Sequence, residues 1–120
     1  MVWPLIRGHV YRIKLQADDP AKKGQMIDKY VVILQGRKEF QGRVRTTVVL
    51  ATTTLSAQGK PWNVLVPKGT VKFWPEDTLI TCLDVYALPV AEIKAGSLVG
   101  MLPDPVMADV AVALAVSLEL

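Results

Sequence analysis

The feature that most constrains the fold is a series of short strand-like segments, broken by glycine and proline, that ends in one helical segment. Alternating or β-branched runs, which are typical of strands, occur at 7–15, 30–34, 46–55, 62–66 and 78–88, with 70–74 as a further candidate. Strands and helices do not alternate along the chain, which argues against a parallel sheet. The pattern predicts one mainly β domain over residues 1–120, a small antiparallel barrel of about five to seven strands.

The segments between these strands predict charged loops. Residues 16–28 contain Asp-Asp-Pro and a glycine, and residues 36–44 place two glycines around basic residues, which favours a loop or hairpin tip. In the first of these loops the apolar pair Met26 and Ile27 could cover a substrate or a partner segment. Residues 90–94 are compatible with one helical turn or with a strand end.

The C-terminal segment predicts a helix that is apolar on nearly all sides. Asp104 is a natural N-cap, and Pro105 suits the first helical position. One face, at helical spacing, consists of Met107, Val110, Ala111, Leu114 and Leu118. The opposite face is nearly as apolar, since it contains Ala108, Val112 and Ala115. We therefore expect one face to pack on the barrel and the other to pack on a partner subunit.

Charge is distributed unevenly along the chain. Eleven basic and four acidic residues precede Pro67, a net charge of +7, whereas the remainder carries three and seven, a net charge of −4. A basic half indicates an anionic partner, with nucleic acid the usual candidate, while a solvated basic surface is the alternative. The candidates for contact with a phosphate backbone form one loop: Arg37, Lys38, Arg43 and Arg45.

Cysteine and histidine content excludes two classes of protein. Cys82 is the only cysteine and His9 the only histidine, so neither an intramolecular disulfide nor a metal-ligand cluster is expected. We expect no cofactor. A lone cysteine suits a reducing compartment, and the apolar C-terminal stretch is too short to span a bilayer. The sequence therefore predicts a cytoplasmic protein without a membrane segment.

Five segments, in order along the chain, resemble the MazF/PemK family of toxins, which includes Kid and is related to CcdB. They are Arg7 to Tyr11, Lys29 to Gln35, Thr46 to Thr54, Asp77 to Asp84 and Val110 to Leu118. The resemblance covers about residues 6–120 and implies an SH3-like barrel, a homodimer and a cognate antitoxin peptide. It also implies metal-independent cleavage of single-stranded RNA, in which the ribose 2′-OH attacks the adjacent phosphate.

The resemblance also implies roles for particular residues. Lys29 stands where the family has an arginine that acts on the phosphate, and Thr54 matches a threonine whose hydroxyl could bind a phosphate oxygen. His9 replaces an aspartate and is a candidate for proton transfer, because its ordinary pKa is near neutrality. Arg7 and the basic loop would assist in holding RNA. No metal takes part.

Two residues of the long strand depart from the family pattern. Asp84 and Tyr86 stand where the family has glutamine and arginine, and they are expected on one strand face with Cys82. Asp84 is either a site residue or a structural carboxylate that needs a partner across a dimer or from a backbone N–H. Cys82 is expected to be a buried, unreactive thiol.

Three functions remain open from the sequence. The first is an endoribonuclease toxin, in which Trp62 and Trp74 either stack on bases or pack in the core or at a dimer contact. The second is a MazF-like binding module for an antitoxin, a protein or a nucleic acid, suggested by the departures at Lys29, Asp84 and Tyr86. The third is a gyrase poison like CcdB, although residues 117–120 lack an aromatic tip.

Overall fold

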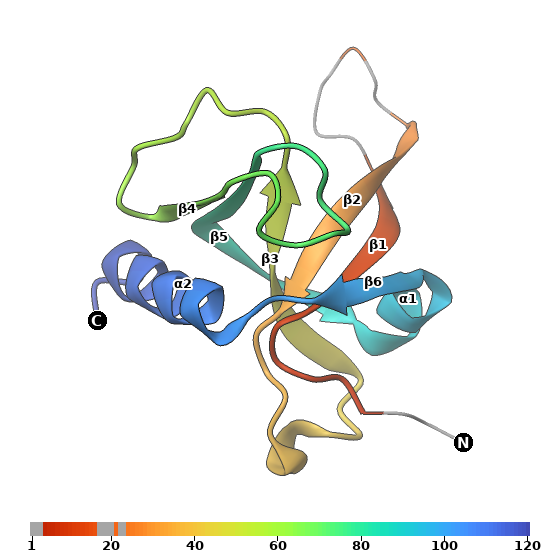
Figure 1. Ribbon diagram of the computed structural model, residues 1–120. Helices are drawn as coiled ribbons and strands as arrows, with labels where there is room; N and C mark the ends of the chain where they lie inside the picture. Colours follow the sequence, from red (N-terminus) through yellow and green to blue (C-terminus); the bar gives the residue numbers. More distant parts are fainter. Residues whose placement is uncertain (1–3, 17–20, 22–23) are drawn as a thin grey trace.

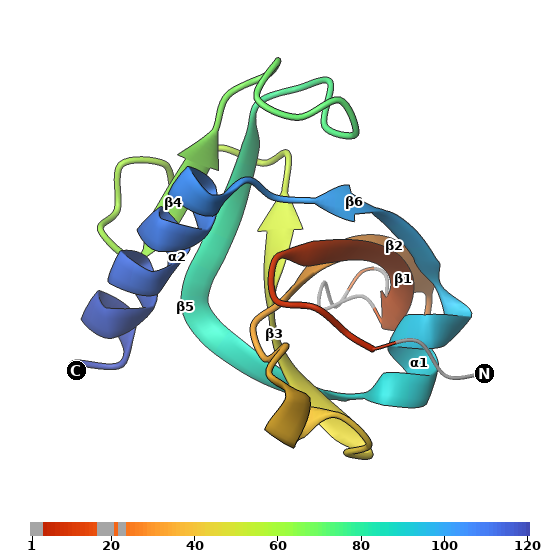
Figure 2. The ribbon, with the colours of Figure 1, turned by 60° about the horizontal axis from the view of Figure 1, so that its bottom comes forward.

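The computed structural model describes residues 4–16, 21 and 24–120 and consists of a six-stranded antiparallel sheet with two α-helices. The strands are β1 (His9–Gln16), β2 (Met26–Ile33), β3 (Arg45–Thr52), β4 (Asn63–Val66), β5 (Thr78–Pro89) and β6 (Ser97–Met101). The helices are α1 (Val90–Ala95) and α2 (Asp104–Ser117), and Lys38–Phe40 forms one 3₁₀ turn. The sheet order is β4-β5-β3-β2-β1-β6, and the sheet curls into a half-open barrel, as Figures 1 and 2 show. The predicted mainly β antiparallel barrel with a C-terminal helix is confirmed.

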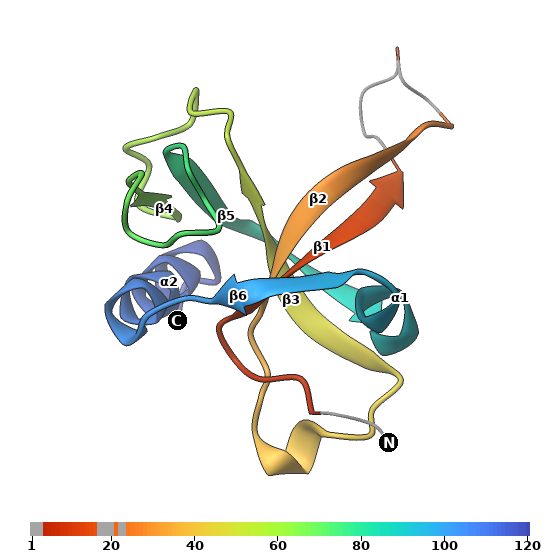
Figure 3. The same ribbon diagram turned by 45° about the vertical axis from the view of Figure 1, so that its right-hand side comes forward.

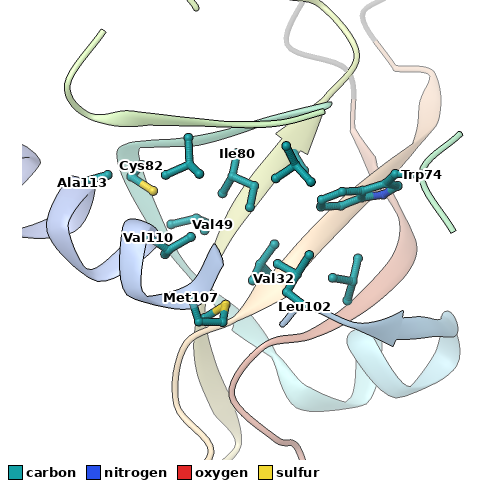
Figure 4. Packing of buried hydrophobic residues seen from close by; sticks show 13 residues of the cluster. Val32, Val49, Trp74, Ile80, Cys82, Leu102, Met107, Val110 and Ala113 are labelled. Carbon is teal, nitrogen blue, oxygen red and sulfur yellow. The ribbon is translucent and has the colours of Figure 1, made fainter. Parts of the chain in front are cut away.

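Both faces of the sheet carry a hydrophobic core, because neighbouring residues of each central strand are buried on opposite sides. The α2-side core contains Val32, Val49 and Cys82 of the sheet with Met107 and Val110 of α2 (Figure 4). The α1-side core contains Tyr11, Val31, Ile33 and Val48 with Ile93 of α1, and it lies within the curl of the sheet. A strand that is buried on both faces reads as a continuous apolar run, which is how residues 30–34 read in the sequence.

The predicted strand boundaries need four corrections. β2 begins at Met26, so Met26 and Ile27 belong to a strand and not to the expected loop. β3 ends at Thr52, three residues earlier than expected. Residues 70–74 are a turn and a loop, and β6 was not predicted, because its Ser-Leu-Val-Gly-Met sequence is short and interrupted by glycine. Residues 17–20 and 22–23 of the expected first loop lie outside the described residues.

The predicted start of the C-terminal helix was correct to within one residue, whereas Ala111 and Leu118 of the expected packing face are exposed. Pro103 occupies the N-cap position, and Asp104 is the first helical residue, without a side-chain capping hydrogen bond. Asp104 therefore interacts with the positive helix N-terminus through charge and not as a cap. α1 is a second helix, so the helical alternative for residues 90–94 is the correct one. No helix among the described residues is long and apolar enough to cross a membrane.

A large irregularity in β5 separates residues that were expected to share one face. Val48 of β3 pairs with Tyr86, but Leu50, two residues on, pairs with Thr81, five residues away on β5. The extra residues of β5 bulge out of the ladder, and the side-chain alternation is lost there. Cys82 is fully buried, whereas Asp84 is exposed and Tyr86 is 36% exposed. The expectation that these three share a strand face was wrong.

The connection between β4 and β5 folds back over the sheet and shields the α2-side core from solvent. Trp74 in this connection is only 2% exposed and meets Tyr30 of β2 edge to face, with ring centroids 5.7 Å apart. Phe73 packs over Gly100 of β6, where a Cβ would lie 2.4 Å from the Phe73 ring. The backbone N–H of Lys68 donates to an Asp77 carboxylate oxygen at 2.8 Å, which ties the two ends of the connection together. Of the two alternatives for Trp74, internal packing is therefore correct.

Candidate functional site

The start of β2, which contains Lys29, and the end of β3, which leads into the threonine run 52–54, lie at the same end of the sheet. Lys29 is half-buried near the start of β2 and pairs with Ile13 of β1. The ladder between β2 and β3 ends at the pair Tyr30 and Ala51, and Lys29 and Thr52 are the residues next to this last pair on the two strands. Lys29 therefore presents a cation near the place where the chain leaves β3.

The threonine run ends β3 through a local hydrogen bond. The Thr52 hydroxyl oxygen accepts the backbone N–H of Thr54 at 3.1 Å, a turn that competes with further strand pairing. Thr53 and Thr54 are both exposed beyond this turn. Thr53 lines an open pocket of about 500 Å³ with Lys68 and Asp77. Thr53 was missed in the sequence, where three consecutive threonines offered no means of choosing among them.

The predicted RNA-binding loop lies at the opposite end of β3. Figure 1 shows the 3₁₀ turn at the bottom of the molecule and the connection that follows β3 at the top. The eight residues of β3 separate Arg45 from Thr52 by about 23 Å at the usual strand rise. The structure therefore does not bring the basic loop, residues 37–45, to Lys29 and Thr54 within one chain.

Most arginines around that loop make local contacts. Arg43 donates to Gln35 Oε1 at 3.1 Å, Arg45 to the Ala87 carbonyl at 3.3 Å, and Arg37 forms an exposed ion pair with Glu39. Arg7 donates to the Leu34 carbonyl at 2.8 Å and lies at the same end of the sheet. Lys38 is exposed on the 3₁₀ turn. Exposed contacts of this kind contribute little to stability, so these cations stay available to a phosphate backbone.

His9 also lies away from Lys29. It begins β1 opposite Met101 of β6, four residues before Ile13, the partner of Lys29, which is about 13 Å along the strand. Its Nδ1 atom is buried without a hydrogen-bond partner among the described residues. Burial lowers the pKa of His9 below the ordinary histidine value, because the charged imidazolium is poorly solvated there.

The shifted pKa of His9 predicts that the protein is less stable in mild acid. The unfolded chain binds a proton near pH ~6.5, while folded His9 resists it, so the unfolded state gains protons first as the pH falls. The free energy of unfolding should therefore decrease between about pH 7 and the lower pKa of the folded state. Urea midpoints of the wild type and of His9→Gln at both ends of this range measure it. Because His9 is the only histidine, an equal pH dependence in the variant would contradict this assignment.

The remaining candidates do not form a catalytic group with Lys29. Asp84 is exposed on the β5 bulge, so it needs no buried partner. Burial raises the pKa of the Cys82 thiol to about 11, and at 0% exposure the thiol stays protonated and unreactive. In the part of the chain that the structure describes, no three His, Cys, Asp or Glu side chains are grouped as a metal site.

Comparison of whole folds gives several solved structures with the same architecture. An endoribonuclease from a mycobacterial species, in complex with its cognate antitoxin, is 22% identical, with a TM-score of 0.74 over 97% of this chain and 96% of that one. The MazE–MazF complex of Deinococcus radiodurans is 16% identical, with a TM-score of 0.75 over 99% of both chains. Mycobacterium tuberculosis toxin MazF-mt6 is 22% identical, with a TM-score of 0.67 over 92% and 96%. At these identities the likeness establishes the fold alone.

A family model supplies the identification. The search of curated proteins gave no match. The model of the PemK-like, MazF-like toxins of type II toxin–antitoxin systems, however, matches residues 6–118, which is nearly the whole chain. That range contains every strand and both helices. The chain therefore belongs to the PemK-like, MazF-like family of toxins of type II toxin–antitoxin systems.

Proposed function

We propose that this toxin is an endoribonuclease that cleaves single-stranded RNA at the end of the sheet where β2 begins and β3 ends. The observation that supports the proposal is the register of β2 and β3, whose last pair is Tyr30 and Ala51, so that the half-buried Lys29 and the threonine run 52–54 both adjoin that pair. A cation and hydroxyl groups that lie close together can stabilise the negative charge that develops on a reacting phosphate. The description of two mycobacterial structures with this fold as endoribonucleases supports it.

In this reaction the ribose 2′-oxygen forms a bond to phosphorus and the bond from phosphorus to the 5′-oxygen breaks. The 2′-OH proton leaves to a base, and the departing 5′-oxygen takes up a proton. Lys29 stabilises the negative charge that accumulates on the phosphorane oxygens, and Thr54 or its neighbour Thr53 donates a hydrogen bond to one of them. His9 lies too far along β1 to reach the same phosphate within one chain, so it does not belong to this set.

The direct test is incubation of the purified protein with a long RNA of varied sequence at neutral pH in the presence of EDTA. Cleavage should proceed without metal and should leave the ends of the transesterification, a 2′,3′-cyclic phosphate and a free 5′-hydroxyl. RNA that remains intact across many sequences would overturn the proposal. Retained RNA binding without cleavage would instead favour the binding-module alternative.

The proposed inhibitor is a cognate antitoxin whose binding segment is acidic. Solved structures with this fold include complexes with antitoxins. The net charge of +7 on the residues before Pro67 favours an acidic peptide over a neutral or basic one. The proposal predicts that addition of the antitoxin encoded beside this toxin abolishes RNA cleavage.

We further propose that two copies associate through the outward face of α2. Met107, Val110 and Ala113 are buried on the barrel side of this helix. On the other side Val112 is 65% exposed, Val116 is 44% exposed and Leu118 is 53% exposed, with Leu83 of β5 also exposed close to the helix end. An exposed apolar patch of this kind is typical of a subunit interface.

Val112→Asp should convert the dimer into a monomer, because it buries an unpaired carboxylate in an apolar contact. Light scattering after size-exclusion chromatography measures the mass of each variant. Val44→Asp is the matched control, since Val44 is 81% exposed in the loop before β3 and should leave the mass unchanged. A wild type that is monomeric at micromolar concentration would contradict the proposed interface.

A further inference from the structure

The last strand of the sheet, β6, has an unpaired edge. It ends the strand order and pairs only with β1. Alternate residues of a strand direct their N–H and C=O groups to opposite sides, so part of the β6 backbone faces away from β1. Among the described residues, none of these outward groups forms a backbone hydrogen bond to another segment. Figure 3 shows β6 crossing the near side of the molecule from α1 towards α2.

The β6 edge, residues 97–101, lacks the features that normally prevent a strand from pairing with another chain. Native edge strands are protected by charged side chains, by proline or by a covering segment. β6 has the sequence Ser-Leu-Val-Gly-Met, which contains neither a charge nor a proline. Phe73 packs where a Cβ of Gly100 would stand. Because Cβ atoms point out of the plane of a sheet, this contact covers one face of β6 and not its edge.

The other face of β6 carries exposed apolar side chains. Leu98 pairs with Tyr11 and Met101 pairs with His9, since a bulge in the ladder adds one residue between them. Directly opposite residues share a face, so Leu98 and Met101 both project to the α1 side of the sheet. Leu98 is 51% exposed and Met101 is 52% exposed. Ile6, which is 38% exposed, lines with Leu98 a hollow of about 290 Å³ beside the strand.

An open strand edge beside an exposed apolar surface is the usual arrangement for docking an extended peptide. Main-chain hydrogen bonds would hold such a peptide, and every second side chain would face the apolar surface. A hollow of this size accommodates one apolar side chain of the peptide. The β6 edge therefore has both of the elements that strand addition requires.

A second copy of this chain does not suit the β6 edge. The proposed dimer is a two-fold contact through α2. A second two-fold contact, at β6, would link one dimer to the next and produce an open chain of dimers without a defined size. The occupant that we infer is therefore a different protein chain.

The family of this chain indicates which protein that is. Type II systems pair a toxin with an antitoxin, and the antitoxin proposed above has an acidic binding segment. Arg12 of β1 lies opposite Ser97, is exposed, and adds a cation beside the β6 edge. We propose that an extended segment of the antitoxin adds to β6 as a seventh strand, with an apolar side chain against Leu98 and an acidic one towards Arg12. This inference rests on the proposed antitoxin partner and is independent of RNA cleavage.

Amide hydrogen exchange tests the backbone pairing directly. The full-length toxin, alone and in complex with the purified antitoxin encoded beside it, would be compared amide by amide by NMR. The amides of residues 97–101 that face away from β1 should exchange at least about tenfold more slowly in the complex, because a paired N–H exchanges only when the strand opens. The amides of Asn63–Val66, at the opposite edge of the sheet, should exchange at an unchanged rate.

Substitutions on the exposed face test the side-chain contacts. Leu98→Asp and Met101→Asp place a charge where the apolar side chain of the peptide would lie, and each should weaken antitoxin binding in calorimetry at least about tenfold. Leu65→Asp is the matched control, since Leu65 is 41% exposed on β4, the other edge strand. None of these residues belongs to the proposed RNA site, so all three variants should cleave RNA as the wild type does when no antitoxin is present.

Three results would overturn the inference. The first is an unchanged exchange rate of the β6 amides in the complex. The second is equal antitoxin affinity of Leu98→Asp, Met101→Asp and Leu65→Asp. The third is a wild type that forms assemblies larger than a dimer and that Leu98→Asp returns to a dimer, which would assign the edge to a second copy. An antitoxin that does not bind the wild type would refute this inference and the proposed inhibitor together, whereas cleavage of RNA without antitoxin would still support the proposed activity.

Discussion

Replacing Lys29 by alanine should lower kcat for RNA cleavage by about 10²–10³-fold, the usual loss when one group that stabilises transition-state charge is removed. Lys29 is half-buried, and a charge near the protein surface is screened less than a charge in bulk water. The effect should fall on kcat because the phosphate gains negative charge only as the 2′-oxygen attacks. Initial rates on a short fluorogenic RNA, with folding checked by circular dichroism, measure this loss.

Two further substitutions separate this role from general attraction of RNA. Lys29→Arg should retain at least the wild-type kcat, because the guanidinium keeps the charge and offers two parallel hydrogen bonds to phosphate. Lys38→Ala removes an exposed lysine at the far end of β3 and should raise KM while changing kcat less than about twofold. Equal losses of kcat in Lys29→Ala and Lys38→Ala would mean that the reacting phosphate does not lie beside Lys29.

The sequence predicted the strands whose residues pack against one another and failed where tertiary contacts decide the conformation. The runs at 30–34 and 46–55 are rich in β-branched residues, and both are central strands. β6 is invisible in the sequence, because Gly100 lies in a strand only through its pairing with Val10 and its contact with Phe73. The bulge in β5 is equally hidden, since Leu83, Asp84 and Val85 continue an unbroken strand pattern.

The structure brings some of the predicted site residues toward one end of the sheet and separates others from them. Lys29 and Thr54 were expected together, and the sheet register brings the ends of their strands together. The basic loop and His9 were expected to assist them, yet they lie at the other end of the sheet. The sequence shows that basic residues are present. In an antiparallel sheet, however, successive loops lie at opposite ends of the strands, and only the strand pairing shows at which end a given basic residue lies.

Removing the indole of Trp74 should lower the free energy of unfolding by about 3–5 kcal/mol, a large part of the ~5–15 kcal/mol of a typical domain. Trp74 is 2% exposed and packs edge to face on Phe73 and Tyr30, at ring centroid distances of 5.2 and 5.7 Å. Trp74→Ala would leave a cavity in the α2-side core. The connection between β4 and β5 cannot move in to fill it, because the hydrogen bond between Lys68 and Asp77 holds its two ends together. Urea unfolding followed by far-UV circular dichroism measures the change.

Trp62→Ala is the matched control, because Trp62 is only partly buried and should cost less than half as much. Trp74→Phe should lie between the two, since it keeps an aromatic contact and removes an Nε1 donor that has no partner among the described residues.

The loss of Trp74 should also affect RNA cleavage, because Tyr30 is the residue after Lys29 and Trp74 holds the ring of Tyr30 in place. A Trp74→Ala protein that is folded at low temperature should therefore cleave RNA more slowly than Trp62→Ala. If the two alanine variants lost equal stability, the connection between β4 and β5 would not be the cover of the core that its burial indicates.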